Sequence, residues 1–199
     1  MNLAVRLAEE KDLPQIKKLV DVYIAVDFYT IEDLEGMLRG EDDLLYVVAD
    51  RDREDAVVAY FYAFLSTLDE ALRVLHVKDK PKALQGYPGD TRVGVFKTTS
   101  TDKAYRNRGL FSNFMSDLQP VLLERGARLI MNTALRPLGR EIPILNTLKR
   151  TGFVPVAEVH RPWVGRWGYC PYCQQYYCIC DAVLYIKEFD TKGDAELDG

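Results

Sequence analysis

The chain has 199 residues, 48% of them hydrophobic and 28% charged, so it can bury one sizeable core, and its length favours a single domain. Its 26 basic and 30 acidic residues give a formal net charge of −4, which argues against nucleic-acid binding by phosphate neutralisation. The N-terminal segment lacks the basic and apolar regions of a signal peptide, and no apolar run approaches a membrane span. We therefore expect a cytoplasmic protein with no membrane contact.

Hydrophobic periodicity predicts alternating strands and helices along most of the chain. The expected strands are residues 3–7, 44–50, 56–66, 93–101, 128–134, 153–160 and 181–189. The expected helices are residues 8–25, 30–40, 110–127 and 142–150. Residues 68–77 suit either a short helix or a strand. The order β-α-α-β-β-(insertion)-β-α-β-α-β-β predicts an α/β domain with one mixed sheet over residues 1–189. The acidic residues 190–199 are expected to form a disordered tail.

The fourth expected strand ends in a basic, glycine-containing turn, and a helix begins directly after it. We call residues 104–112, AYRNRGLFS, the glycine loop. The first turn of a helix has unpaired N–H groups and partial positive charge, and Arg106 and Arg108 add to it. The pattern predicts a phosphate or pyrophosphate site on the N–H groups of residues 107–112. A plain polar loop is the alternative, and GxxxxGK[ST] and GxGxxG are both absent.

The run from Arg106 to Phe111, RNRGLF, resembles the signature of the GNAT superfamily of N-acetyltransferases, which is Arg or Gln, two residues, Gly, one residue, then Gly or Ala. Residues 5–20 resemble the family's first strand and helix. Residues 145–156 resemble its late helix and the Gly-Phe before its sixth strand. The resemblance implies a largely antiparallel mixed sheet flanked by helices. It also implies transfer of an acetyl group from acetyl-CoA to an amine, through direct attack by that amine.

The resemblance also implies where the donor binds. The pyrophosphate is expected on the glycine loop, and the pantetheine arm along the end of the preceding strand. Asn146 in the late helix is a further candidate contact, although a solvated helix residue is an equally good interpretation. The expected cofactor-binding residues are Thr99, Ser100, Thr101, Arg106, Asn107, Arg108, Gly109, Leu110, Phe111, Ser112 and Asn146.

Two positions depart from the family pattern. Phe111 stands where Gly or Ala is usual, so its ring must point away from a bound phosphate. Leu148 stands where many members have a tyrosine that protonates the leaving thiolate. No catalytic residue is therefore assigned. Glu141 and His76 are the candidates for a base, against the simpler interpretations of a helix-start carboxylate and a structural or solvated histidine.

All four cysteines lie in residues 161–180, which we call the cysteine excursion. Cys170, Cys173, Cys178 and Cys180 form C-x2-C-x4-C-x-C, a pattern that favours a closed structural zinc site of four thiolates. Two disulfides, a redox dithiol or buried thiols are the alternatives. A redox CxxC precedes a helix, whereas these cysteines lead into a strand.

The place of the cysteine excursion between the last two strands suggests a structural clasp, distant from the chemistry. Its aromatic and basic side chains suit a peptide, a nucleic acid or a second copy of the chain, or else they pack around the metal. The acceptor is expected to be a small-molecule or peptide amine. The alternative function is a non-catalytic, zinc-stabilised module that binds acyl-CoA or a partner.

Overall fold

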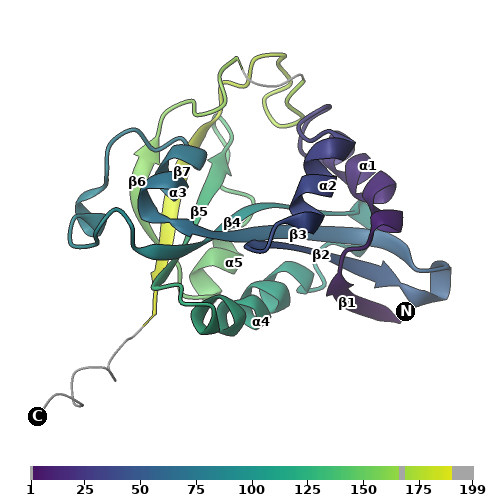
Figure 1. Ribbon diagram of the computed structural model, residues 1–199. Coiled ribbons are helices and arrows are strands. Elements are labelled where there is room, and N and C mark those ends of the chain that lie inside the picture. Colours follow the sequence, from purple (N-terminus) through teal and green to yellow (C-terminus); the bar gives the residue numbers. More distant parts are fainter. Residues whose placement is uncertain (1, 166–168, 190–199) are drawn as a thin grey trace, which may run out of the picture.

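The computed structural model describes residues 2–165 and 169–189 and forms one seven-stranded sheet in that part of the chain. The strand order is β1-β2-β3-β4-β5-β7-β6, with helices on both faces (Figure 1). The strands are β1 (Leu3–Leu7), β2 (Asp43–Asp50), β3 (Ala56–Thr67), β4 (Arg92–Thr101), β5 (Leu129–Arg136), β6 (Val154–Val159) and β7 (Asp181–Glu188). Every neighbouring pair is antiparallel except β4 and β5, so the mixed, largely antiparallel sheet is confirmed.

The helices divide between the two faces of the sheet. They are α1 (Leu13–Tyr23), α2 (Ile31–Arg39), α3 (Leu68–Val74), α4 (Leu110–Glu124) and α5 (Leu145–Arg150). Tyr60 of β3 packs with α1 and α2, whereas its neighbour Phe61 packs with α4 on the other face. Successive strand residues point to opposite faces, so this alternation sorts the apolar residues into two layers of core. Among the described residues, no helix is long and apolar enough to cross a membrane.

Residues 68–77, for which the sequence allows either a helix or a strand, begin with helix α3. The hydroxyl of Thr67 accepts a hydrogen bond from the N–H of Glu70 at 3.3 Å, which caps the helix. Leu68, Ala71 and Leu72 form the buried face of α3, which packs against residues of β4 and β5. The cap and the spacing of the buried residues both favour the helix over a strand.

The first strand and the first helix are joined by an ion pair. The guanidinium of Arg6 donates to both carboxylate oxygens of Asp12, at 2.6 and 2.9 Å. The N–H of Glu9 donates to the same carboxylate at 2.8 Å. Burial alone would raise the pKa of Asp12, but these hydrogen bonds outweigh it and hold that pKa below its usual value.

Strands β4 and β5 separate halfway along their length. Their parallel pairing runs only from Val93 to Phe96 on β4. Beyond this point β4 stays paired with β3 as far as Thr101, with a bulge at Lys97, while β5 stays paired with β7 as far as Arg136. The two strands therefore leave a gap in the middle of the sheet, with strand backbone on both sides of it.

Strands β6 and β7 are direct neighbours, and the cysteine excursion leaves and returns at the same end of this pair. Val159 is the last residue of β6 and pairs with Ala182. At the neck, Nδ1 of His160 lies 2.8 Å from Oδ1 of Asp181, which also accepts the N–H of Arg161 at 3.1 Å. Figure 1 shows the excursion rising on the side of the sheet that carries α1 and α2.

Candidate active site

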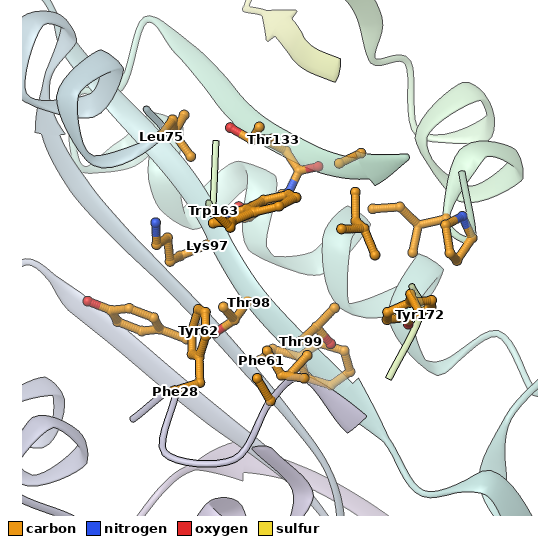
Figure 2. A pocket seen from close by; sticks show the side chains of 18 of the residues that line it. Phe28, Phe61, Tyr62, Leu75, Lys97, Thr98, Thr99, Thr133, Trp163 and Tyr172 are labelled. Carbon is orange, nitrogen blue, oxygen red and sulfur yellow. The ribbon is translucent and has the colours of Figure 1, made fainter. Parts of the chain in front are cut away.

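A pocket occupies the gap between β4 and β5 and reaches both faces of the sheet. On one face it is lined by residues from α4 and the segment before α5, including Phe111, Phe114 and Ile144. On the other face it is lined by Phe28, by Leu75 and by side chains of the cysteine excursion. Figure 2 shows Phe28, Tyr62 and Trp163 gathered around this opening. The pocket therefore has walls from both faces of the sheet and from the strand ends.

Hydrogen bonds of Tyr105 and Asp102 hold the glycine loop in place. The buried Tyr105 hydroxyl donates to Oδ2 of Asp50 at 2.6 Å, and Oδ1 of Asp102 accepts the N–H of Ala104 at 2.9 Å. Asn107 and Gly109 have positive φ angles of 61° and 77°, so the chain turns sharply before α4. These contacts and turns aim the start of α4 at the gap.

The first amides of α4 are available for an anion. The first intrahelical bond runs from the N–H of Asn113 to the carbonyl of Gly109 at 2.9 Å, and in the described chain no side chain caps this end. The N–H groups of Leu110, Phe111 and Ser112 thus have no intrahelical acceptor. These amides belong to the residues that the sequence predicts for a phosphate site.

The two arginines of the glycine loop lie along the loop itself. Nε of Arg106 donates to the carbonyl of Thr101 at 3.0 Å, and its guanidinium lies 4.6 Å from the ring centre of Tyr23. Nη2 of Arg108 donates to the carbonyl of Ala104 at 3.2 Å. Both side chains are exposed and neither lines the pocket, so they add positive charge around the glycine loop.

A third cation, Arg150, lies near the glycine loop and was not predicted from the sequence. Nη2 of Arg150 on α5 donates to Oγ of Ser112 at 3.2 Å, and the hydroxyls of Ser112 and Thr147 lie 3.2 Å apart. These contacts place a guanidinium beside the first turn of α4. Nothing in the local sequence of Arg150 signals this, because the contact depends on α5 packing next to α4.

The ring of Phe111 packs on the wall of the pocket. It stacks on Phe61 with 6.0 Å between ring centres and an angle of 5° between planes. Phe61 also stacks on Phe114, at 4.1 Å. The side chain of Phe111 therefore packs into the core, while its backbone N–H stays at the start of α4.

The hydroxyl groups at the end of β4 are already engaged. Oγ1 of Thr99 donates to the carbonyl of Tyr60 at 3.0 Å, and Oγ of Ser100 donates to that of Leu19 at 3.4 Å. Thr99 lines the pocket, whereas Ser100 and Thr101 do not. Any contact that this segment makes with a pantetheine arm must therefore come from backbone groups more than from side chains.

The two candidate bases fall in different places. His76 lies two residues after the end of α3, has a φ of 59° and lines the pocket. Glu141 is exposed and lies outside the pocket lining, as does the exposed Asn146. Leu148 is fully buried in the core, so the position that carries a tyrosine in many GNAT members holds no acid here.

Two buried polar atoms in the pocket were missed by the sequence analysis. Nδ2 of Asn132 donates to the carbonyl of Phe96 at 2.8 Å, but Oδ1 of Asn132 and Oγ1 of Thr133 have no hydrogen-bond partner in residues 2–165 and 169–189. A buried polar atom without a partner costs free energy, so these atoms suit a ligand or water. The only sequence signal was an asparagine inside an apolar strand.

The four cysteines form a compact cluster with the geometry of a metal site. All four are free thiols, and their sulfur atoms lie within 4.8 Å of one another. Four sulfurs around a zinc ion at about 2.3 Å would be separated by about 3.8 Å, so a small contraction would suffice. The N–H of Cys170 donates to the carbonyl of Gln175 at 2.9 Å and closes the turn that holds the first pair.

The thiols are electrostatically coupled. The Cys178 thiol donates to Cys170 and lowers the pKa of Cys170 to about 5, and the N–H groups of Cys173 and Tyr172 act in the same direction. That same bond raises the pKa of Cys178, and burial raises the pKa of Cys180 to about 12. A bound cation would favour all four thiolates, so the donor set fits zinc.

The cysteine excursion is part of the pocket, which corrects the expectation of a distant clasp. Cys170, Cys178, Trp163 and Tyr172 all line the pocket. The excursion folds over the gap in the sheet because it starts at the end of β6 and packs on Leu135 at the end of β5. The aromatic residue Trp167 and the residues 190–199 lie outside the described residues.

Comparison with known proteins gives matches in structure but none in sequence. No protein-family model and no curated protein sequence matches this chain. Arabidopsis thaliana NAA60 in complex with acetyl-CoA is similar with a TM-score of 0.67 at 16% identity, over 94% of this chain and 99% of that chain. A chain of the NatC complex bound to Gag peptide and CoA is similar with a TM-score of 0.66 at 14% identity, over 95% and 99%.

A Streptococcus pneumoniae acetyltransferase of the GNAT family is also similar, with a TM-score of 0.60 at 16% identity, over 94% of this chain and 100% of that chain. Identities this low establish the fold alone. Each of the three matches covers at least 94% of this chain. The chain therefore has the fold of the GNAT N-acetyltransferases, as its sequence predicts.

Proposed function

We propose that this protein is an acetyl-CoA-dependent N-acyltransferase in which the acceptor amine attacks the thioester directly. The observation that carries the proposal is the pocket in the gap of the sheet, which is lined by Phe111 of the uncapped first turn of α4 on one face and by aromatic side chains on the other. Two substrates bound from opposite faces would meet at the gap between β4 and β5. The similar structures that hold acetyl-CoA, or CoA with a peptide, support this arrangement.

The donor would bind on the face that carries α4 and α5. Its pyrophosphate would accept hydrogen bonds from the amides of Leu110, Phe111 and Ser112, where the helix dipole also favours negative charge. Arg106, Arg108 and Arg150 surround this place with positive charge. The pantetheine arm would extend into the gap, where residues of β4 and β5 line the pocket and their backbone groups can pair with the amides of the arm.

The reaction exchanges a carbon–sulfur bond for a carbon–nitrogen bond and moves one proton from the amine and one to the thiolate. The amine nitrogen forms a bond to the acetyl carbonyl carbon, the carbon–sulfur bond breaks, and the thiolate of CoA takes up a proton. The attacking amine loses its own proton to a base or to water. Among the described residues that line the pocket none is Asp or Glu, and we propose His76 as the base.

The pocket tyrosine Tyr62 is not suited to that role. Its hydroxyl donates to Oδ1 of Asp43 at 2.5 Å, and burial together with this bond raises its pKa. The phenol therefore stays neutral and points its proton at Asp43. This leaves the imidazole as the side chain that can take a proton near neutral pH.

A second candidate function is a non-catalytic module that binds acyl-CoA. The burial of Leu148 favours it, because no acid stands there to protonate the thiolate. The two functions share the donor site and differ in turnover. Measuring binding and turnover on the same protein therefore separates them.

The test combines calorimetry with a thiol assay. Acetyl-CoA should bind, and a panel of small-molecule and peptide amines should include at least one that releases free CoA. Tight binding without release of thiol by any amine would favour the module over the enzyme. In the double variant Arg106→Ala with Arg108→Ala, acetyl-CoA affinity should fall about tenfold, because two cations leave the donor mouth. The matched control is Arg39→Ala, which removes an exposed arginine from α2, and the double variant binding like that control would contradict the donor site.

We also propose that Cys170, Cys173, Cys178 and Cys180 hold a structural zinc ion. The cluster of free sulfurs and the N–H groups directed at Cys170 support it. Four thiolates leave no open coordination position, so such an ion would take no direct part in acyl transfer. It would stabilise an excursion that is too short to build a core of its own.

A further inference from the structure

We propose that the metal-bound cysteine excursion forms the acceptor-side wall of the pocket, so that metal occupancy controls acceptor binding while donor binding is independent of it. The wall that it builds suits an amine attached to an apolar, preferably aromatic, group. This inference rests on the proposed acyltransferase function, since it assigns the second half of the same pocket.

The excursion meets the pocket through the residues that would hold the metal and through their neighbours. Cys170 and Cys178 line the pocket directly, and Tyr172 lies inside the first cysteine pair. Trp163 packs both on the cysteine cluster and on the apolar core beneath α3. A change in the position of the cysteines must therefore move the pocket wall as well.

The chemistry of this wall selects the acceptor. Across from Trp163 and Tyr172 the opening is lined by Phe28, Tyr62 and Leu75 (Figure 2). Lys97 is a cation on this side, and its ammonium donates to the carbonyl of Val74 at 2.8 Å. The guanidinium of Arg106, which lies over the ring of Tyr23, also acts electrostatically on Tyr172. With a lysine and no carboxylate among the described lining residues, a polyamine or other second cation would be disfavoured. An aromatic group would bury its ring against the rings of the wall.

The wall depends on the metal because little else holds the excursion. Tyr169, Tyr176 and Tyr177 are exposed, and Tyr176 and Tyr177 have 72% and 69% of their surface accessible. The described backbone bonds within the excursion close only its short turns, such as that between Cys170 and Gln175. A bound ion would tie the four sulfurs, which lie within 4.8 Å of one another, into one crosslink between the turns, and without it that crosslink is missing.

The donor side is held by other parts of the molecule. Tyr105 is anchored on Asp50 of β2, and the N–H of Asp102 donates to the carbonyl of Val58 at 2.8 Å. These anchors come from the opposite half of the sheet to β6 and β7. Removing the metal should therefore leave the glycine loop and the start of α4 in place.

The test compares CoA with two CoA derivatives alkylated on sulfur, which reach from the donor site into the acceptor half. One carries an N-phenethyl acetamide group and the other an N-(2-aminoethyl) acetamide group. With zinc-loaded protein, calorimetry should show the phenethyl derivative binding about tenfold more tightly than CoA, because its ring becomes buried. The aminoethyl derivative should show no such gain.

Metal removal is the decisive step. After treatment with a mercurial and EDTA followed by reduction, the affinity for CoA should stay within about twofold, whereas the tenfold gain for the phenethyl derivative should disappear. Adding zinc back should restore it. This procedure uses the unaltered chain, so it remains informative if cysteine variants fail to fold.

A matched pair of variants tests the wall itself. Tyr172→Ala removes a ring that lines the pocket and should abolish the gain, whereas Tyr177→Ala removes an exposed ring of the same excursion and should keep it. The inference would be overturned if the phenethyl derivative still bound tenfold more tightly than CoA after metal removal. It would also be overturned if metal removal weakened the binding of CoA itself about tenfold. Failure of zinc-loaded protein to bind CoA at all would instead overturn the proposed donor site.

Discussion

The glycine loop and the cysteine excursion both border the same pocket, but different forces hold them in place. The glycine loop rests on the buried hydrogen bond from Tyr105 to Asp50 and on that from the N–H of Ala104 to Asp102, and it presents backbone amides. The excursion has few such anchors and presents side chains, with four sulfurs at its centre. The comparison teaches that a binding site for a constant donor can be built from backbone, while a site for a particular acceptor needs side chains and a way to fix them.

The largest effect is expected from removing one thiol. Cys180→Ser should reduce bound zinc from about one ion per chain to nearly none, because a closed site needs all four thiolates. Metal analysis of the purified protein measures this directly. Ile179→Val, between the last two cysteines, is the matched control and should keep the metal. A Cys180→Ser protein that retains a full equivalent of zinc would show that the cysteines do not form one site.

A smaller effect, on turnover, should separate the two candidate bases. His76→Gln removes the imidazole that lines the pocket and should lower kcat about 100-fold, the size expected for losing a general base. Glu141→Gln changes an exposed carboxylate outside the pocket and should leave kcat within about twofold. The acceptor found in the amine panel serves for both assays. Equal activities in the two variants would assign the proton transfer to water.

The glycine loop should respond through its backbone alone. A Cβ at Gly109 would find Asn113 no closer than 3.8 Å, so the site has room, but its φ of 77° is unfavourable for a β-branched residue. Gly109→Val should therefore displace the first amides of α4 and lower acetyl-CoA affinity about tenfold, with zinc content unchanged. Gly36→Ala, in a helix with open space around it, is the control. Loss of zinc in Gly109→Val would contradict the independence of the two regions.

The smallest effect on either region is expected from a change far from both. Asp12→Asn removes the negative charge from the ion pair with Arg6 and should lower the free energy of unfolding by about 2 kcal/mol at pH 7. The affinity for acetyl-CoA and the zinc content should not change. Because the folded-state pKa of Asp12 lies below its unfolded value, this stabilisation is present at neutral pH. It is lost as the pH falls below the ordinary value of 3.8. Urea unfolding at pH 7 and pH 3 should show the difference between the two proteins shrinking. A constant difference would mean that the carboxylate charge is not its source.

Much of the fold was accessible from the sequence because the strands are rich in buried β-branched and aromatic residues. The expected strand at residues 56–66 matches β3, and that at 93–101 matches β4, each within one residue. The turn into α4 was also predictable, since a glycine between arginines marks it. Strand order was not, because β7 lies between β5 and β6 only through pairing distant in the sequence.

The acceptor half of the site was not predictable for a similar reason. Trp163 and Tyr172 looked like partners of the cysteines, and only the sheet geometry shows that they face the gap. Asn132 sits among apolar residues of β5, where its unpartnered oxygen becomes visible only once the separation of β4 and β5 is known. Sequence patterns report on neighbours along the chain, whereas these contacts join segments more than 30 residues apart.

The closure of the β6–β7 neck at Val159 and Ala182 has a consequence for how this architecture can change. The chain departs from the sheet after Val159 and returns at Asp181, which already pairs with Arg136 of β5, so residues 161–180 can vary in length and content without altering any strand pairing. Replacing the excursion with another segment would therefore change the acceptor side of the pocket and leave the proposed donor site unaltered. New acceptor specificities could be recombined at this single junction.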